Sequence, residues 1–521
     1  MWSGRSIRWM KADPSDRARF DSLNPASGVV VDSFAVHTEA QVQAVVAAAK
    51  PGALWWNGLG FDGRESRLRD WARILALEID ELAALIHREN GKPLTDARLE
   101  VVGVIEHLHW AATHAAGVLG RRTVGRSWLF PNHKPSVGYR PYGVVGVIGP
   151  WNYPAFTPMG SIAYALAAGN AVVFKPSEYT PAVGSWLVDS FRRAVPEQPV
   201  LQLVTGFGET GAALCTAGVG KLAFTGSTAT AKSVMAACAQ TLTPVLLECG
   251  SKDALIVAED ADLDAAAQAA VWGALSNAGQ TCVGVERVYA VDAIYDDFVS
   301  RLSAEARKPR PGSDPAADYG PITMPDQVGI IRGHIEDALD HGATAIVGGR
   351  DSVRPPFVDP TILVDTPEDR PAATEETFGP TLTVGRVRDV DEAIKRANGT
   401  AFGLSSAVFS RARGMEIAGR LRAGMTSINS VITFAVIPAL PFGGVGASGF
   451  GRIHGADGLR EFSWPHAIVA QQAPGPLILQ SFRRNPLLTR ALLLAVRLRY
   501  GRRHPVDSRG PCDNRFGTRG P

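Results

Sequence analysis

The amino-acid sequence predicts an α/β protein built on doubly wound parallel sheets. From about residue 142, short apolar runs of the kind found in buried parallel strands alternate with helical segments. The apolar runs lie at residues 144–148, 171–174, 201–204, 221–224 and 245–247. Such alternation is typical of sheets whose ligands bind at the carboxyl ends of the strands.

The segments between and after these runs supply helices and a second α/β unit. A helix is expected over residues 158–168, because Gly169-Asn170 is a typical helix stop. The second unit begins near residue 251, with a helix from about Asp262 to Ala278 and a strand over residues 287–291. Further helix and strand pairs continue to about residue 430, and the glycine-rich run 441–449 then predicts an extended loop.

Size and composition are those of an ordinary globular protein with more than one domain. The chain has 521 residues, 45% of them hydrophobic and 20% charged, so its core is expected to divide. Its five cysteines show no paired spacing and no CxxC motif, which favours free thiols in a reducing compartment. Neither a secretory signal nor an apolar run of about 18 residues is apparent, so a cytoplasmic location is expected.

Positive charge is concentrated at the C-terminal end. The net charge is +2, whereas residues 470–521 hold ten arginines and two aspartates, a net of +8, so the rest of the chain sums to −6. Residues 487–499 predict a short helix, and Arg483, Arg490 and Arg497 recur every seven residues along one stripe, with leucines elsewhere. Two interpretations stay open, a helix on an anionic membrane surface and a disordered soluble tail. Nucleic acid is not expected as a partner, because the folded body has no basic stripe.

Three residues on separate loops form a candidate catalytic set. Cys282 lies on a polar turn after a helix, and Asn152 follows a buried strand in a Gly-Pro-Trp-Asn-Tyr-Pro run. Glu248 ends an apolar strand 34 residues before the cysteine. A thiol, an amide and a carboxylate would supply a nucleophile, an oxyanion stabiliser and a general base. Taken singly, each has an ordinary alternative: a packing thiol, a turn asparagine and a solvated carboxylate.

Two other patterns are interpreted as structural. Residues 206–211 match GxGxxG, but no acidic residue ends a strand at the required distance, so we expect a tight strand-to-helix turn. His107 and His109 have no matching pair of ligands, and we interpret them as satisfied surface histidines. No metal site is expected.

Several ordered motifs together resemble the NAD(P)-dependent aldehyde dehydrogenases over about residues 24–475. They are 24–28 (NPASG), 149–154 (GPWNYP), 175–178 (KPSE), 224–228 (FTGST), Glu248, 279–282 (GQTC), 375–380 (EETFGP) and 441–444 (PFGG). The resemblance implies that Cys282 attacks the aldehyde and that Asn152 and the Cys282 backbone N–H stabilise the oxyanion. Glu248 would then activate the water that hydrolyses a thioester.

The resemblance also implies a cofactor site and a domain organisation. The cofactor-binding residues would be Trp151, Lys175, Glu178, Gly226, Ser227, Glu376 and Phe378. Glu178 would repel a 2′-phosphate, which favours NAD over NADP. The implied domains are a Rossmann-like cofactor domain (1–120 and 142–250), a catalytic α/β domain (251–450), an oligomerisation segment (121–141 and 463–478) and a basic tail (479–521). A homodimer or homotetramer is the implied assembly.

The sequence departs from the family pattern near the presumed base. Ser251 replaces a glycine of the usual Glu-Leu-Gly-Gly-Lys, Cys249 stands beside Glu248, and Ala231 replaces the last glycine of the 224–231 motif. Cys249 is either a second reactive thiol or a buried filler.

The segment expected at the substrate entrance, residues 431–438, is almost entirely apolar. It favours an aliphatic or aromatic aldehyde, unless it packs against a neighbour. The alternatives are a charged semialdehyde of the succinate type, a CoA-acylating reaction, and a membrane-associated scaffold that keeps the fold without activity. Glu248 argues against the CoA-acylating reaction, and the intact set of three residues argues against the scaffold.

Overall fold

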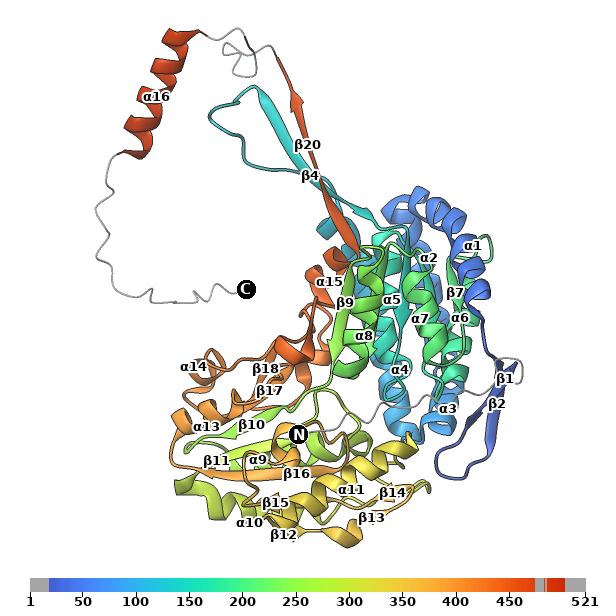
Figure 1. Ribbon diagram of the computed structural model, residues 1–521, viewed down its shortest axis with the longest axis vertical. Helices are drawn as coiled ribbons and strands as arrows, with labels where there is room; N and C mark the ends of the chain where they lie inside the picture. The colour runs from blue at the N-terminus through green and yellow to red at the C-terminus, as the bar shows by residue number, and fades with distance from the viewer. Residues whose placement is uncertain (1–17, 474–481, 483–484, 502–521) are drawn as a thin grey trace. The chain divides into compact units, whose positions relative to one another are not determined.

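The computed structural model describes residues 18–473, 482 and 485–501. The described residues of 1–121 and 138–466 form one compact unit, and those of 122–137 and 467–521 form another (Figure 1). Cys512, residues 474–478 of the expected oligomerisation segment and most of the basic tail lie outside the described residues.

The first sheet of the large unit has six strands in the order β19-β9-β8-β5-β6-β7. The strands are β5 (Val144–Ile148), β6 (Ala171–Lys175), β7 (Leu201–Leu203), β8 (Lys221–Gly226), β9 (Val245–Cys249) and β19 (Gly449–Phe450). β5 to β9 pair in parallel, and only β19 runs antiparallel, beside β9. From β5 the chain builds outward to β7 and then returns to the other side of β5 for β8 and β9. The predicted Rossmann-like, doubly wound sheet is therefore confirmed, with its switch point between β5 and β8.

Helices before and between these strands bury the sheet. They are α1 (Glu39–Gly58), α2 (Gly60–Leu77), α3 (Ile79–Asn90), α4 (Leu94–Leu119), α5 (Phe156–Ala168), α6 (Pro181–Ala194), α7 (Gly208–Thr216) and α8 (Thr228–Ala239). α5 packs on β5, β6 and β8 and on α4, whereas α1 packs on β5 to β7 and on α7. As predicted, α5 stops at Gly169, which takes the left-handed conformation with φ +103°.

The run that matches GxGxxG is a turn, as the sequence predicts. Gly206 has a φ of +144°, and α7 begins two residues later. A side chain at Gly206 would overlap the Thr210 hydroxyl, so glycine is required here for both conformation and space.

The second sheet of the large unit has seven strands in the order β12-β15-β16-β11-β10-β17-β18. The strands are β10 (Ala254–Val257), β11 (Arg287–Val291), β12 (Thr344–Val347), β15 (Thr361–Val364), β16 (Thr381–Val387), β17 (Ser405–Phe409) and β18 (Met425–Ile428). Its helices are α9 (Leu263–Leu275), α10 (Tyr295–Ala306), α11 (Pro325–Asp340), α12 (Pro371–Thr374), α13 (Val390–Ala397) and α14 (Gly414–Ala418). All pairs are parallel except β12 with β15.

One helix of the second sheet is shorter than predicted. α9 ends at Leu275 rather than near Ala278, and a tight turn over Ser276–Gly279 follows it. Asn277 and Ala278 have φ values of +52° and +58°, which no α-helix can contain. Cys282 therefore follows a tight turn and not the end of the helix itself.

The remaining elements complete the two units. The large unit also holds β1 (Arg19–Leu23), β2 (Val30–Ala35), β13 (Val353–Arg354), β14 (Phe357–Val358) and α15 (Gly455–Glu461). Within the expected oligomerisation segment, β3 (Arg122–Thr123) and β4 (His133–Pro141) form a three-stranded sheet with β20 (Ser463–Gln471). The small unit includes α16 (Pro486–Tyr500). Among the helices of the described ranges, none is both long and apolar enough to cross a bilayer.

Candidate active site

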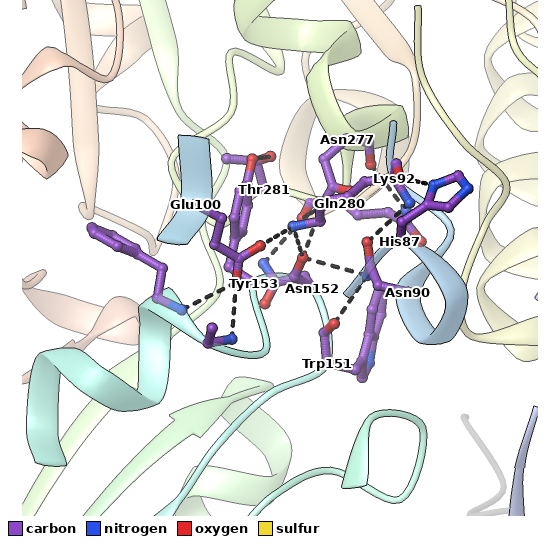
Figure 2. A network of polar contacts seen from close by, with 12 residues as sticks. His87, Asn90, Lys92, Glu100, Trp151, Asn152, Tyr153, Asn277, Gln280 and Thr281 are labelled. Atoms are coloured by element: carbon purple, nitrogen blue, oxygen red, sulfur yellow. Dashed lines mark hydrogen bonds and ion pairs between the residues drawn. The ribbon is translucent and has the colours of Figure 1, made fainter. Parts of the chain in front are cut away.

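The structure brings the loops of Asn152 and Cys282 into direct contact. The Asn152 side-chain amide (Nδ2) donates a hydrogen bond to the Gln280 carbonyl at 3.0 Å. The hydroxyls of Tyr153 and Thr281, the next residues along each loop, lie 3.0 Å apart (Figure 2). The Asn152 loop follows β5, whose carboxyl end lies at the switch point of the first sheet. An amide donor and a thiol thus meet where a doubly wound sheet binds its ligands.

Glu248 lies at the end of β9 and closes the set. Its side chain is 2% exposed, and neither carboxylate oxygen accepts a hydrogen bond from a described residue. Burial raises the pKa of Glu248 to about 8, while the neighbouring Cys282 and Thr225 lower it by less. A buried carboxylate whose pKa lies near neutrality is suited to act as a general base.

Cys282 is half-buried, at the end of a turn with an unusual backbone. Burial, followed by the negative charges of Glu248 and other nearby carboxylates, raises the pKa of its thiol well above the usual value. The thiol is therefore protonated at rest, and it would have to lose its proton to act as a nucleophile.

The turn before Cys282 is fixed from the far side by the segment over residues 375–380. A side chain on Gly279, which has a φ of +71°, would overlap the backbone of Gly379. The Asn277 side-chain amide spans the turn and donates to the Gln280 carbonyl at 3.2 Å. The backbone that carries Cys282 is thus held by close packing as well as by hydrogen bonds.

Three of the predicted cofactor residues lie at or just after the carboxyl ends of the neighbouring strands β5 and β6. Trp151 lies edge-on to Phe378, with ring centroids 5.5 Å apart. The Lys175 ammonium is buried, donates to the Pro176 carbonyl at 3.1 Å, and lies 3.9 Å from the Glu178 carboxylate, which is 34% exposed. A buried ammonium with donors to spare, beside an accessible carboxylate, fits the hydroxyl groups of a ribose.

Gly226 and Ser227 lie where β8 meets α8. Ser227 caps the 12-residue helix, since its hydroxyl accepts from the Thr230 N–H at 3.2 Å. The remaining N–H groups of this first turn suit a phosphate. Ala231, one of the departures from the family pattern, is 2% exposed in α8 and is a packing residue.

Glu376 and Phe378 lie on the segment that backs the cysteine turn. Glu376 accepts a hydrogen bond from the Ser251 N–H at 2.8 Å, and burial raises its pKa to about 8. The Ser251 hydroxyl turns away to the carboxylate of Asp253. The extra side chain at position 251 is therefore accommodated in a buried hydrogen-bonded network.

Cys249 behaves as a filler. It is 2% exposed, and burial together with the charge of Glu248 raises the pKa of its thiol to about 12. Such a thiol supplies almost no thiolate at neutral pH. The filler interpretation of this residue is the one that its surroundings favour.

Several residues that hold the site were missed from the sequence. Asn90, Lys92 and Glu100 lie at the junction of α3 and α4, and all three are buried beside the Asn152 loop. The sequence feature that could have indicated them is the run Glu-Asn-Gly-Lys-Pro at 89–93. Polar and charged residues at a helix end are usually exposed to solvent, so this run did not predict burial. Its burial depends on contacts with residues about 60 positions away.

The interpretation of His107 as a surface residue was wrong. It is 1% exposed, its Nε2 lies 3.0 Å from the Ala435 carbonyl, and burial lowers its pKa to about 4. His109, two residues later, is exposed. His107 supports the apolar segment 431–438 from below, as does Tyr164, which donates to the Pro438 carbonyl at 3.2 Å.

Comparison with known proteins defines the class to which this fold and site belong. The profile of the aldehyde dehydrogenase family matches residues 9–468. A 4,4'-diapolycopene aldehyde oxidase of Methylomonas sp is 38% identical over 448 residues, which cover 85% of this chain and 84% of that protein. A glutarate-semialdehyde dehydrogenase of Pseudomonas putida is 35% identical over 460 residues, which cover 87% and 94%.

Solved structures agree with the sequence relatives. The crystal structure of an NAD-dependent aldehyde dehydrogenase from Sinorhizobium meliloti superposes with a TM-score of 0.84 at 31% identity, covering 88% of this chain and 93% of that one. This chain therefore belongs to the aldehyde dehydrogenase family. It is an oxidoreductase that acts on small-molecule aldehydes with NAD or NADP, and its family is generally oligomeric.

Proposed function

We propose that the chain oxidises an apolar aldehyde to the carboxylate through a thioester on Cys282, with NAD as the hydride acceptor. The observation that carries the proposal is the convergence of Cys282, Asn152 and a buried Glu248 without a hydrogen-bonding partner among the described residues. The reaction needs all three groups, namely a nucleophile, an oxyanion donor and a base.

The first half of the reaction builds a bond to Cys282. The Cys282 thiol gives up its proton to solvent water, and the sulfur attacks the carbonyl carbon of the aldehyde. The carbonyl oxygen becomes an oxyanion, which the Asn152 Nδ2 and the Cys282 backbone N–H stabilise. A nicotinamide held beside Glu376 and Phe378 would supply the acceptor for the hydride that leaves this carbon.

The second half of the reaction hydrolyses the thioester and regenerates the Cys282 thiol. The product of oxidation is a thioester, and Glu248, once it has lost its proton to solvent, takes a proton from a water molecule. The water oxygen attacks the thioester carbon, the same donors stabilise the second oxyanion, and the carbon–sulfur bond breaks. Carboxylate leaves, and Cys282 regains its proton.

Seven residues would hold the cofactor. Gly226 and Ser227 would contact its pyrophosphate, and Lys175 and Glu178 would bind its adenosine ribose. Glu376 and Phe378 would bind its nicotinamide ribose, with Trp151 beside Phe378. The accessible carboxylate of Glu178 supports NAD over NADP, because a 2′-phosphate beside it would be repelled. Some relatives are named as NADP(+)-dependent, so the ratio of kcat/KM for the two cofactors, in the protein and in Glu178→Gln, tests this part.

The exposed apolar side chains of segment 431–438 support an apolar substrate. Val436 is 59% exposed and Ile437 42% exposed, whereas Phe434 packs inward. One relative is named an oxidase of 4,4'-diapolycopene aldehyde, and others are named semialdehyde dehydrogenases, so a charged semialdehyde is the second candidate. NADH formation should show a higher kcat/KM with hexanal or benzaldehyde than with succinate semialdehyde. The reverse order would exclude the apolar substrate.

The control for the reaction itself is Cys282→Ala. Aldehyde-dependent NADH formation should be lost in this variant, while Cys249→Ala, a neighbouring buried thiol, should retain it. Activity that survives in Cys282→Ala would overturn the mechanism.

We further infer two contacts with partners. β20 is an edge strand of its sheet, and its Ile468 and Val469 are 42% and 63% exposed, which supports a contact between copies of this chain in a dimer or tetramer. Light scattering of the purified protein and of Val469→Lys tests this contact. A monomeric parent protein would exclude it.

The second contact is peripheral, between α16 and an anionic membrane. None of its residues is buried, Leu493, Leu494 and Leu498 are more than half exposed, and no acidic residue occurs between positions 470 and 506. Apolar side chains and arginines on one helix complement a bilayer with anionic headgroups. Flotation with phosphatidylserine liposomes should recover the full chain and not a chain ending at residue 480. Equal recovery of both would leave a soluble tail.

A further inference from the structure

We propose that Asn90, Lys92 and Glu100 form a polar clamp that positions Asn152 for oxyanion stabilisation (Figure 2). This inference rests on the proposed role of Asn152 and adds residues that do not touch the substrate. The three side chains belong to the end of α3, the linker to α4 and the first turns of α4, far from the catalytic loops in sequence.

The centre of the clamp is the backbone carbonyl of Asn152. It accepts a hydrogen bond from the Lys92 ammonium at 2.9 Å and from the Asn277 side-chain amide at 2.9 Å, with the Asn90 amide at 3.4 Å. A carbonyl oxygen has two lone pairs, so this one is fully used. The Asn90 amide also donates to the preceding carbonyl, that of Trp151, at 3.0 Å. Two successive peptide groups are thus held from the same side.

Glu100 holds the other end of the loop and the lysine at once. One carboxylate oxygen accepts from the backbone N–H groups of Ala155 and Phe156 at 2.8 and 3.0 Å. The other oxygen pairs with the Lys92 ammonium at 2.5 Å. The chain from Asn152 to Phe156 is therefore fastened at both ends by one buried ion pair.

The link to the nucleophile is a closed ring of hydrogen bonds. Asn277 donates both to the Asn152 carbonyl and to the Gln280 carbonyl, and the Asn152 side chain donates to that same Gln280 carbonyl. When the Asn152 peptide is fixed, the direction of its side-chain amide relative to the cysteine turn is fixed as well. Asn152 has a second Nδ2 hydrogen for the oxyanion, because only one goes to Gln280.

Stability alone is a poor explanation for this arrangement. Lys92 and Glu100 are 1% and 0% exposed as side chains, and burying two charges costs free energy that their attraction often fails to recover. The ammonium also lies 3.9 Å from the centre of the Tyr153 ring. What the pair provides in return is a fixed backbone beside the reacting atoms, which is the requirement for an oxyanion site that needs no reorganisation.

The test compares two reactions of the same thiol in the full-length protein. Acylation of Cys282 by p-nitrophenyl acetate passes through an oxyanion and releases p-nitrophenolate, whereas alkylation by iodoacetamide is a direct displacement at carbon and forms no oxyanion. In Lys92→Met we expect acylation to slow about 10- to 100-fold, and alkylation of Cys282, followed by peptide mass spectrometry, to change less than about twofold. A merely structural role would slow both reactions alike.

Matched variants make each outcome decisive. Arg98→Met removes an exposed arginine from α4, the helix that carries Glu100. Arg98 pairs with Asp80 at the surface, so the rates of acylation and alkylation should both be unchanged. Asn152→Ala serves as the reference for loss of the donor. If Asn152→Ala does not slow acylation, the proposed oxyanion role itself is wrong.

If Asn152→Ala slows acylation and Lys92→Met does not, the clamp is wrong while the mechanism stands. Should Lys92→Met fail to fold, Asn90→Ala takes its place, because it removes the hydrogen bond to Trp151 and leaves the ion pair intact. Unchanged acylation in a folded Asn90→Ala would then reject the clamp.

Discussion

Asn152 and Glu248 differ in how the protein holds them. The Asn152 carbonyl accepts two hydrogen bonds at 2.9 Å, and its side chain donates a third bond at 3.0 Å. Both oxygens of Glu248, equally buried, lack a hydrogen-bond donor in the described part of the chain. An oxyanion donor must not move or change state, whereas a general base must gain and lose a proton in each cycle. The protein fixes the proposed donor by several hydrogen bonds, whereas the proposed base is governed mainly by burial, which raises its pKa to about 8.

Removal of the base should have the largest effect. Glu248→Gln keeps the size of the side chain but cannot accept a proton, so hydrolysis of the thioester should slow by about 10²- to 10⁴-fold. Rapid-quench measurement should show acyl-enzyme accumulating on Cys282 in the presence of aldehyde and NAD. If no acyl-enzyme accumulates and turnover is unchanged, Glu248 is not the base.

Removal of the fixed donor should act on the other step. Asn152→Ala is expected to slow acylation by about 10²- to 10³-fold, the cost of losing one donor to an oxyanion. Single-turnover NADH formation measures this step, and little acyl-enzyme should accumulate. Accumulation equal to that in Glu248→Gln would remove the contrast between the two residues.

The titration of the Glu248 carboxyl should appear in the dependence of kcat on pH. The carboxylate is the active form and its pKa is about 8, so kcat should rise roughly tenfold per pH unit below pH 8 when hydrolysis limits the rate, and level off above it. Glu248→Gln should flatten this limb. A limb that persists unchanged in the variant would assign the titration to another group.

Substitution of the neighbouring thiol should have the smallest effect. Cys249→Ala removes a buried sulfur whose pKa of about 12 leaves it un-ionised. We expect kcat/KM within about twofold of the parent protein and a modest loss of stability from the small cavity. A loss of activity comparable with Asn152→Ala would give Cys249 a part in the chemistry, and thermal melting separates that outcome from unfolding.

The two regions also differ in how far the sequence predicts them. Strand positions in the first sheet follow from short apolar runs, and β6, β8 and β9 each extend one to two residues beyond the prediction. The loops of Asn152, Glu248 and Cys282 could be placed because each adjoins a strand or helix with a clear pattern. The end of α9 could not, because nothing in helical periodicity marks Asn277 and Ala278 for positive φ.

Burial of charged residues was the other failure. Lys92, Glu100 and His107 lie on helices or linkers where solvent exposure is the usual state. Their partners are the Asn152 carbonyl, the N-terminus of α5 and the Ala435 carbonyl. These partners are 55 to 328 positions away in the chain, so only the assembled fold shows that these polar groups are satisfied.

The contact between Gly279 and Gly379 has a mechanical consequence. The two backbones touch where any side chain on Gly279 would overlap Gly379, and this contact lies between Cys282 on one strand of chain and Phe378 on the other. A side chain at position 279 would therefore have to displace the Gly379 backbone, the cysteine turn or both. Cys282 follows Gly279 by three residues and Phe378 directly precedes Gly379, so such a substitution would disturb the cysteine turn and a predicted cofactor residue together.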